Sequence, residues 1–244
     1  MKDDSIKTEE KLSESYWWFV GRRAIVDSLL RRLVKRTRVA VDVGCGSGGN
    51  LPMLSRYSER VIGLDRSPMA LELAASQGMP LACADGEVIP LSDSSVGLVA
   101  ALDVIEHLDD DQRALREFYR VLQPEGFLLV TVPSYRFLWS EHDEALKHRR
   151  RYVASELHAK LTCCGFQVLK RSYAVFFAFF PILVYRLFRG LFPKDPLAPR
   201  ASYIMLPSVL NNLLIGSLRF EAGMMRVIDI PLGTSVVMLA QKIS

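Results

Sequence analysis

The stretch Val39-Ala-Val-Asp-Val-Gly-Cys-Gly-Ser-Gly-Gly-Asn50 decides the fold of this chain. Its first part, residues 39–43, is almost entirely apolar and β-branched, which is typical of a strand buried on both faces of a parallel sheet. Gly44, Gly46 and Gly48 follow, and a turn without side chains lets the backbone approach a ligand closely. A helix is expected from Asn50, and its free N–H groups would face the same ligand. The stretch therefore predicts the floor of a nucleotide-type cofactor site.

Two classes of cofactor use such a turn. Residues 44–49 satisfy G-x-G-x-x-G, in which a dinucleotide pyrophosphate sits on a helix N-terminus. Starting from Asp42, the same residues satisfy D-x-G-x-G-x-G. Either match alone is weak, so the choice depends on the strands that follow.

Acidic residues follow the next three predicted strands, at or just past their carboxyl ends. The strands are expected over residues 60–64, 80–84 and 96–102, and the acids are Asp65, Asp85 and Asp103. Ligands of open α/β sheets bind at this edge. Asp65 also lies about 20 residues beyond the glycine turn, which is the offset of a ribose-binding acid.

The remaining pattern alternates helices and strands. Helices are predicted over residues 68–77, 109–122 and 153–162, and further strands over 127–132, 166–174 and 234–243. At the N-terminus, two helices are expected over 8–19 and 22–36, split near Gly21. The aromatic cluster Tyr16-Trp-Trp-Phe19 between them is either a cap on the core or a lid over the cofactor.

Taken together, these motifs resemble class I S-adenosylmethionine-dependent methyltransferases, of the broad group that includes the ubiquinone and menaquinone methyltransferases. The resemblance covers roughly residues 38 to 134 and keeps the family's order and spacing. The motifs that carry it are Val41-Asp-Val-Gly-Cys-Gly-Ser-Gly48, Gly63-Leu-Asp65, Ala84-Asp-Gly86 with Ile89-Pro-Leu91, Leu102-Asp-Val-Ile-Glu-His107, and Leu122-Gln-Pro-Glu-Gly126.

The resemblance implies an α/β fold: a three-layer α/β/α Rossmann-like sheet of seven strands, the last antiparallel. The chain departs from the bare fold by a helical insert between the last two strands. We therefore divide it into an N-terminal helical cap (1–36), an S-adenosylmethionine-binding core (37–174), an apolar helical insert (175–232) and the final strand (233–244). A sulfonium cofactor carries no pyrophosphate, so acids at the strand ends suit it better than basic residues would.

The resemblance also assigns cofactor-binding roles for S-adenosyl-L-methionine. Asp42 and the turn would hold the methionine end, Asp65 the ribose and Asp85 the adenine amino group. The complete set implied is Asp42, Gly44, Cys45, Gly46, Gly48, Asp65, Arg66, Asp85, Gly86 and Asp103.

Two histidines are candidate catalytic bases, needed only if the acceptor atom carries a proton. His107 follows the fourth strand, and its alternative role is to cap the next helix. His142 lies in a second cluster, residues 133–152, that resembles the W-x-x-H-D and H-x-R-R-Y stretches of methyltransferases of glycan or lipid assembly. There Arg149 to Arg151 are either an anion clamp or a solvated helix start. No metal is expected, because no pair of histidines has ligand spacing on one element.

The insert, residues 175–232, is strongly apolar but interrupted by Pro181 and Arg186, so its first run falls short of the about 20 apolar residues of a bilayer span. The apolar residues of this first run, from Phe176 to Leu191, recur at helical spacing and form one stripe, which is typical of an interfacial helix. Three alternatives remain: membrane docking, a lid over a lipid-like acceptor, and a homodimer interface or extra core.

Composition agrees with this picture. The chain has 244 residues, half of them hydrophobic, and a formal charge of +4 without a dense basic stripe, which favours an anionic surface over nucleic acid as a partner. The first ten residues lack the apolar core of a signal peptide and the four cysteines suggest no disulfide framework, so a cytoplasmic location is expected, either free or peripheral to the inner face of the membrane.

The sequence thus predicts a methyltransferase acting on a small or lipid- or glycan-linked acceptor, by O-methylation at the membrane face. The alternatives are a soluble small-molecule methyltransferase and a non-catalytic scaffold that binds S-adenosylmethionine.

Overall fold

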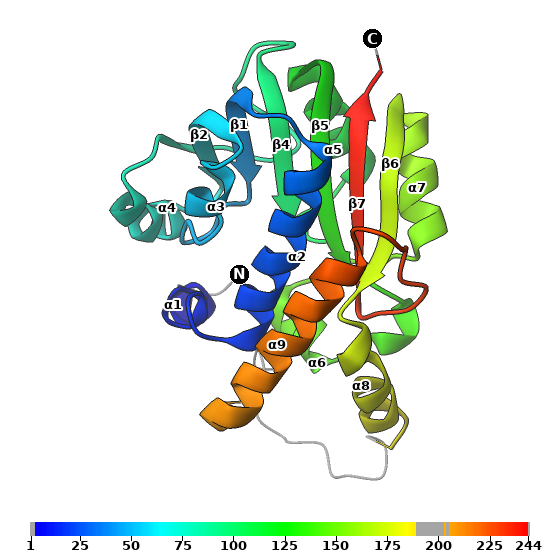
Figure 1. The fold of residues 1–244 in the computed structure, drawn as a ribbon. Helices are drawn as coiled ribbons and strands as arrows, with labels where there is room; N and C mark the ends of the chain where they lie inside the picture. Colours follow the sequence, from blue (N-terminus) through cyan, green and yellow to red (C-terminus); the bar gives the residue numbers. More distant parts are fainter. Residues whose placement is uncertain (1–2, 189–202, 204, 244) are drawn as a thin grey trace.

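A seven-stranded mixed sheet forms the centre of the molecule, in the order β3-β2-β1-β4-β5-β7-β6 (Figure 1). The computed structural model describes residues 3–188, 203 and 205–243. Six strands run in the same direction, and β7 is antiparallel to both of its neighbours, as predicted. The strands are β1 (Thr37–Val43), β2 (Ser58–Asp65), β3 (Leu81–Cys83), β4 (Val96–Leu102), β5 (Leu122–Pro133), β6 (Phe166–Ala174) and β7 (Ser235–Lys242).

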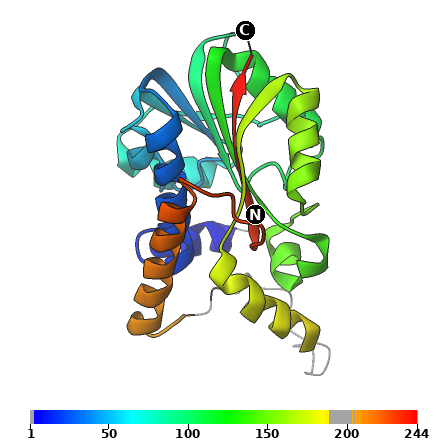
Figure 2. The same cartoon turned by 45° about the vertical axis from the view of Figure 1, so that its right-hand side comes forward.

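Helices cover both faces of the sheet and create two separate cores. Alternate residues of each central strand point to opposite faces, so Val41 and Ala40 belong to different cores. One core lies under α5 (Asp111–Val121) and α7 (Ala154–Cys163), and the other under α2 (Trp17–Leu33), α3 (Leu51–Leu54) and α9 (Ser208–Met224). This is the predicted three-layer arrangement (Figure 2).

The N-terminal helices differ from the prediction. The chain forms α1 (Asp3–Leu12) and one long helix α2, and the break falls at residues 13–16 rather than near Gly21. Gly21 is buried inside α2 because α9 crosses there: a Cβ on Gly21 would lie 2.1 Å from Cδ1 of Leu218. The glycine is therefore a site of close helix packing and not a helix breaker.

The insert is helical, and half of it belongs to the core. It contains α8 (Phe176–Phe188) and α9, and α9 buries Leu218 and Ala222, followed by the buried Met225 just past its end. Glu221 of α9 is also buried, and its carboxylate accepts hydrogen bonds from the amides of Val175 (2.5 Å) and Phe176 (3.0 Å) at the start of α8. Among the described residues, no helix combines the length and apolar character needed to span a bilayer. The predicted continuation of the apolar stripe to Leu191 lies outside the described residues.

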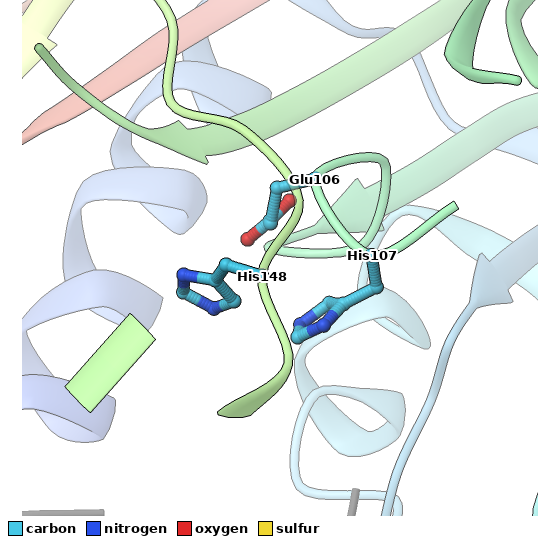
Figure 3. A group of neighbouring side chains, drawn as sticks. All are labelled: Glu106, His107 and His148. Atoms are coloured by element: carbon cyan, nitrogen blue, oxygen red, sulfur yellow. The ribbon is translucent and has the colours of Figure 1, made fainter. Parts of the chain in front are cut away.

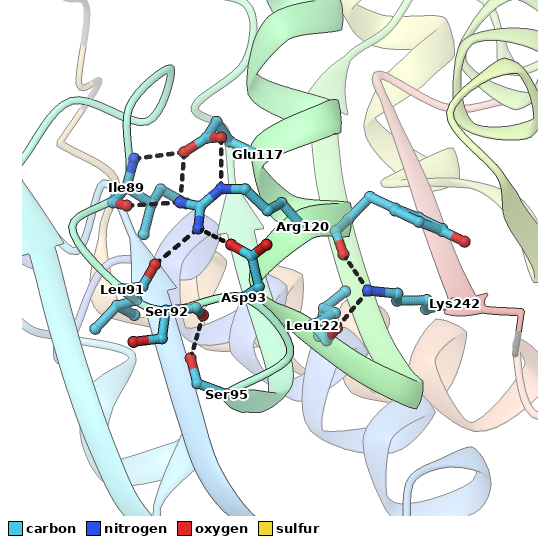
Figure 4. Close-up of polar contacts among 10 residues, drawn as sticks. Ile89, Leu91, Ser92, Asp93, Ser95, Glu117, Arg120, Leu122 and Lys242 are labelled. Carbon is cyan, nitrogen blue, oxygen red and sulfur yellow. Dashed lines mark hydrogen bonds and ion pairs between the residues drawn. The ribbon is translucent and has the colours of Figure 1, made fainter.

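Arg120 of α5 fixes the loop that leads into β4 (Figure 4). Its guanidinium donates to the carbonyls of Ile89 and Leu91 (2.8 Å each) and pairs with Asp93 and Glu117. Hydrogen bonding to Arg120 lowers the pKa of Glu117, although partial burial opposes this. The loop is thereby tied to α5, which anchors the start of the central strand.

The carboxyl ends of the parallel strands open toward the smaller helices. Figure 1 shows α1, α6 (Glu141–Leu146), α8 and one end of α9 beyond that edge of the sheet. The same edge carries the glycine turn after β1 and the loop after β4, so the site is built there.

Candidate active site

One large cavity, of about 1180 Å³, lies over the carboxyl ends of the strands. Its lining comes from the glycine turn, the loop after β4, residues 138–151, the first two helices and α8. A drug-sized ligand site occupies about 300–1,000 Å³. The cavity therefore has room for a cofactor and part of a second molecule.

The glycine turn forms the floor of this cavity. Gly44 and Gly46 have positive φ, at 68° and 54°, which favours glycine. A Cβ on Gly46 would meet nothing within 4 Å, so the turn presents bare backbone to open space. Cys45 also lines the cavity, and burial raises the pKa of its thiol, which keeps it unreactive.

Asp65, at the end of β2, braces the turn. Its Oδ2 accepts a hydrogen bond from the Gly46 amide at 2.9 Å, and its Oδ1 accepts one from the Ser67 amide at 2.8 Å. Asp65 and Arg66 both line the cavity. The carboxylate retains further lone pairs, so it can also accept hydrogen bonds from a ribose.

Asp42 lies directly before the turn and is fully buried. Neither of its carboxylate oxygens has a hydrogen-bond partner among the described residues. Burial raises the pKa of Asp42 to about 7, while the positive charge of Arg22 and the Asn50 side chain oppose the rise. A buried carboxyl without a partner is costly, and a cationic ligand in the cavity would offset that cost.

Three predicted cofactor residues, Asp42, Gly48 and Asp85, are not among the residues that line the cavity. Gly48 packs on the helix that follows β2, since a Cβ there would lie 3.1 Å from that of Ala74. Asp85 is exposed, and its Oδ1 accepts a hydrogen bond from the Glu87 amide at 3.0 Å. Gly86 lines the cavity, but Asp85 is not among the lining residues.

Asp103, just past β4, is already paired. Its carboxylate forms an ion pair with Arg22 of α2 and accepts a hydrogen bond from the Thr131 hydroxyl at 2.9 Å. Asp103 has a positive φ of 59°. Arg22 thus links the N-terminal helices to the strand end, a role that was not predicted. The available signal was an arginine shortly after the aromatic cluster.

The aromatic cluster of residues 16–19 lines the cavity together with Tyr203. The ring of Tyr16 meets that of Tyr203 edge to face, with centroids 5.7 Å apart. The first two helices therefore contribute an aromatic wall, and Trp17 and Trp18 also pack against the core. Both alternatives for this cluster, cap and lid, are compatible with that position.

A histidine pair lies on the opposite wall. The rings of His107 and His148 meet at 73° with centroids 4.7 Å apart, and Glu106 lies beside them (Figure 3). Burial, and then the neighbouring His148, lower the pKa of His107 to about 4. His107 is therefore neutral at pH 7 and a weak proton acceptor. Glu106 is fully buried, and burial raises its pKa well above the usual range.

The arginines after His148 hold this loop in place. Arg149 pairs with Asp109 at 2.6 Å, Arg150 with Asp111 at 3.2 Å, and Arg151 with Asp143 at 2.7 Å. Each guanidinium thus has a carboxylate partner from the protein. The sequence did not reveal these three acids. The Arg149 side chain is 51% exposed, which is compatible with a solvated helix start, and both alternatives, that start and an anion clamp, stay predictions.

Asp143 organises the same loop from a buried position. It accepts hydrogen bonds from His148 Nδ1 (2.8 Å), from Arg151 and from the Ser140 amide, which completes a capping box at the start of α6. Burial opposes ionisation of Asp143, but the bonds from His148 and Arg151 outweigh it and hold its pKa well below the usual range.

His142, the second candidate base, lines the cavity from α6. Its ring meets that of Tyr203 edge to face, with centroids 6.0 Å apart. His107 and His142 therefore share one cavity with the glycine turn.

Comparison with known proteins identifies the fold. Residues 41–130 match the methyltransferase domain family. These residues therefore carry the sequence pattern of a methyltransferase domain. A protein of Mycolicibacterium smegmatis named as a probable S-adenosylmethionine-dependent methyltransferase is 31% identical over 166 residues, 66% of this chain and 64% of the relative.

Two further relatives extend the comparison. The malonyl-[acyl-carrier protein] O-methyltransferase of Enterobacter lignolyticus is 33% identical over 148 residues, 55% of this chain and 57% of the relative. A chain in the complex of the Haloferax volcanii Trm112 methyltransferase activator with a methyltransferase has the same fold, with a TM-score of 0.65 at 19% identity over 99% of this chain and 97% of that one. The chain thus spans less than two thirds of the length of the two sequence relatives.

The residues around the cavity fit S-adenosylmethionine. The bare turn at Gly46 accepts a closely bound ligand, and the unpartnered Asp42 carboxyl suits a ligand that carries positive charge. When bound, the cofactor supplies an activated methyl group on a sulfonium. The Gly44–Gly46 backbone, Asp42 and Asp65 are the residues that would hold it.

Proposed function

We propose that this chain transfers the methyl group of S-adenosylmethionine to an oxygen of an amphiphilic acceptor, lipid- or glycan-linked, that reaches the cavity from a membrane surface. The observation that carries the proposal is the continuity of one cavity, which is lined by the glycine turn, by His107 and His142, and by Ile182 and Tyr185 of α8. A donor on the turn and an acceptor along α8 would therefore meet in the same space.

The chemistry requires mainly alignment. An acceptor oxygen attacks the methyl carbon, the C–S bond breaks with its electron pair going to sulfur, and the acceptor proton leaves to a base or to solvent. Holding the two molecules in line and excluding water supplies most of the acceleration. In this proposal residues 37–174 with 233–244 form the core, residues 1–36 cap the donor, and residues 175–232 bind the acceptor.

The surface of α8 supports the membrane contact. Phe180, Val184 and Leu187 lie on one stripe of the helix and are 51%, 52% and 71% exposed. On the other insert helix, Val209 and Leu213 are 81% and 67% exposed. Exposed apolar side chains gathered on neighbouring elements mark an interaction surface. Tyr185 of α8, which is 54% exposed, also lines the cavity. The net charge of +4 favours an anionic bilayer.

The O-methyltransferase among the relatives and the resemblance to quinone methyltransferases are compatible with an oxygen acceptor on an apolar molecule.

Turnover on a lipid extract tests the proposal. The full chain, incubated with S-adenosylmethionine and a lipid extract, is expected to yield a lipid product heavier by one methylene group, detected by mass spectrometry. A product only in the water-soluble extract would contradict the membrane acceptor and favour a small-molecule methyltransferase. Cofactor binding without product in either extract would favour a non-catalytic scaffold.

Flotation with anionic liposomes tests the surface separately. The double variant Val184→Gln, Leu187→Gln is expected to lose flotation, whereas Val88→Gln, which changes a 56% exposed side chain far along the sequence from the insert, keeps it. Equal flotation of both variants would contradict docking through α8, and a dimer of the wild-type chain that dissociates in the double variant would assign the surface to self-association.

A further inference from the structure

The loop after β4 and the segment before α7 bring together three side chains that can act as metal ligands: Glu106, His107 and His148. One ligand atom from each lies within 4.8 Å of the others. Figure 3 shows the Glu106 carboxylate pointing toward the His148 ring, with the His107 ring beside it. Glu106 and His107 are neighbours in sequence, but His148 arrives from 41 positions further on.

Backbone contacts fix this approach. The Arg149 amide donates to the Glu106 carbonyl at 2.8 Å, and the Arg149 side chain donates to the His107 carbonyl at 3.1 Å. Arg150 donates to the carbonyls of Leu108 (2.9 Å) and Asp109 (3.0 Å). The segment that carries His148 is thus attached along the whole loop after β4, so the three side chains are placed by the fold and not by chance proximity.

His148 is oriented as a ligand would be. Its Nδ1 lies 2.8 Å from Oδ1 of Asp143, a carboxylate that can only accept a hydrogen bond when ionised. Nδ1 therefore donates to Asp143, and in the neutral ring the lone pair is on Nε2. A carboxylate behind the imidazole is the usual support of a metal-bound histidine. Asp143 is itself fixed by Arg151.

Glu106 supplies the independent sign of a missing ligand. It is completely buried, and neither of its carboxylate oxygens has a hydrogen-bond partner among the residues that the structure describes. Glu106 nevertheless lines the large cavity. The nearby acids Asp103 and Asp143 already have arginine partners, whereas Glu106 has none. A cation beside Glu106 would provide the interaction that the protein does not.

We propose that Glu106, His107 and His148 bind a divalent transition-metal ion of the Zn²⁺ type, and that the position left open toward the cavity takes the acceptor oxygen. Two imidazoles and one carboxylate, with one open position, form a known set for catalytic zinc. Ligand atoms at about 2.0–2.2 Å from such an ion lie closer together than the present limit of 4.8 Å, so the three side chains would move together when the ion binds.

This inference rests on the proposed methyl transfer and explains how the acceptor loses its proton. The ion would lower the pKa of a coordinated hydroxyl, whose proton leaves to solvent. The oxygen then forms its bond to the methyl carbon as the C–S bond breaks toward sulfur. His107, neutral and a weak base, acts as a ligand in this scheme rather than as the proton acceptor.

Metal binding is measured directly, without cofactor or acceptor. The full chain, stripped with a chelator, is titrated with Zn²⁺ in a calorimeter, and bound zinc is counted by elemental analysis after dialysis. One ion per chain is expected.

Glu106→Gln and His148→Ala should weaken binding by on the order of 100-fold or more, and Asp143→Asn by about 10- to 100-fold. His158→Ala, on the half-buried surface of α7, should bind as the wild type does.

Co²⁺ gives a spectroscopic check that does not depend on activity. The wild-type chain should show the visible absorption of four-coordinate Co²⁺, and His148→Ala should not. Circular dichroism and titration with S-adenosylmethionine establish that each variant is folded. Protein zinc sites are saturated far below about 1 mM Zn²⁺, so a wild-type chain that binds no Zn²⁺ at that concentration would overturn the inference. The inference would also be overturned if folded Glu106→Gln and His148→Ala bound Zn²⁺ as tightly as the wild-type chain. If the wild-type chain does not bind S-adenosylmethionine, that result would instead refute the proposed function.

Discussion

The carboxylate of Asp65 holds the amide of Gly46 at 2.9 Å, so the acid at the end of β2 and the turn at the end of β1 form one unit. The second oxygen of Asp65 holds the Ser67 amide, which begins the following helix. The same residue that would bind a ribose therefore also shapes the surface on which the cofactor would lie.

Replacing Asp65 by Asn should weaken S-adenosylmethionine binding by about 10- to 100-fold, because hydrogen bonds to a charged group are worth about 1.5–3 kcal/mol and the amide keeps only one acceptor oxygen. Calorimetric titration measures the affinity. Glu59→Gln, an exposed change on the same strand, is the control and should bind normally. Equal affinity in both variants would remove Asp65 from the cofactor site.

Gly46→Ala should lose cofactor binding for a steric reason. Gly46 and Gly78 both have positive φ, 54° and 68°, and a Cβ at either position meets nothing within 4 Å. Each substitution should cost about 1–2 kcal/mol of unfolding free energy through backbone strain. Only the methyl of Gly46→Ala would occupy the space of the cofactor.

Urea unfolding and titration with S-adenosylmethionine distinguish the two effects. Gly78→Ala is the matched control, because it carries the strain at a position outside the cavity lining. If Gly46→Ala binds the cofactor as well as Gly78→Ala does, the turn at Gly46 is not the floor of the site.

Much of this arrangement follows from the sequence, because buried strands and glycine turns are local patterns. The limits of β4 and β6 and the antiparallel last strand were predictable from apolar runs and family spacing. Gly21 was misread because its lack of a side chain serves packing against Leu218, a residue almost two hundred positions away. Short helix α6 was missed, although Ser140 and Asp143 carry the capping pattern.

The candidate site was only partly predictable for the same reason. The turn, Asp65 and His107 could be named from motifs, but the convergence of Glu106 and His148 depends on backbone contacts between two loops. The ion pairs of Arg149 to Arg151 likewise involve acids that no spacing rule connects with them. The apolar residues of the insert are also not all at the surface, because part of α9 packs into the core.

Gly21→Ala should destabilise the chain even though alanine favours helices. The gain in helix propensity is about 1 kcal/mol, but the added Cβ would lie 2.1 Å from Cδ1 and 2.8 Å from Cβ of Leu218. Overpacking of this kind costs about 1–3 kcal/mol, so we expect a net loss of about 1–2 kcal/mol, measured by urea unfolding.

The control for this change is Gly216→Ala in α9, where a Cβ meets nothing within 4 Å. It should raise the unfolding free energy by about 0.5–1 kcal/mol. A stabilising Gly21→Ala would show that α2 and α9 do not pack as closely as described.

Stability should depend on pH through His107. Its pKa is about 4 in the folded chain because of burial and then His148, against about 6.5 when unfolded. Between these values the unfolded chain binds a proton that the folded chain does not, so stability is full above pH 6.5 and falls as the pH falls toward 4. From pH 7 to pH 5 the loss should be about 2 kcal/mol.

The loss is measured by urea unfolding at each pH in the presence of a chelator. His107→Gln should abolish this part of the pH dependence, and His158→Gln should retain it. Parallel curves for the wild type and His107→Gln would show that His107 has an ordinary pKa.

The most direct test of the account is a calorimetric titration of the full chain with S-adenosylmethionine, its demethylated product S-adenosylhomocysteine, and NAD. We expect binding of the first two at one site per chain and none of NAD, because the turn over Asp42 and Asp65 offers acids and bare backbone to a cationic donor. Binding of NAD, or no binding of either adenosyl compound, would contradict the account.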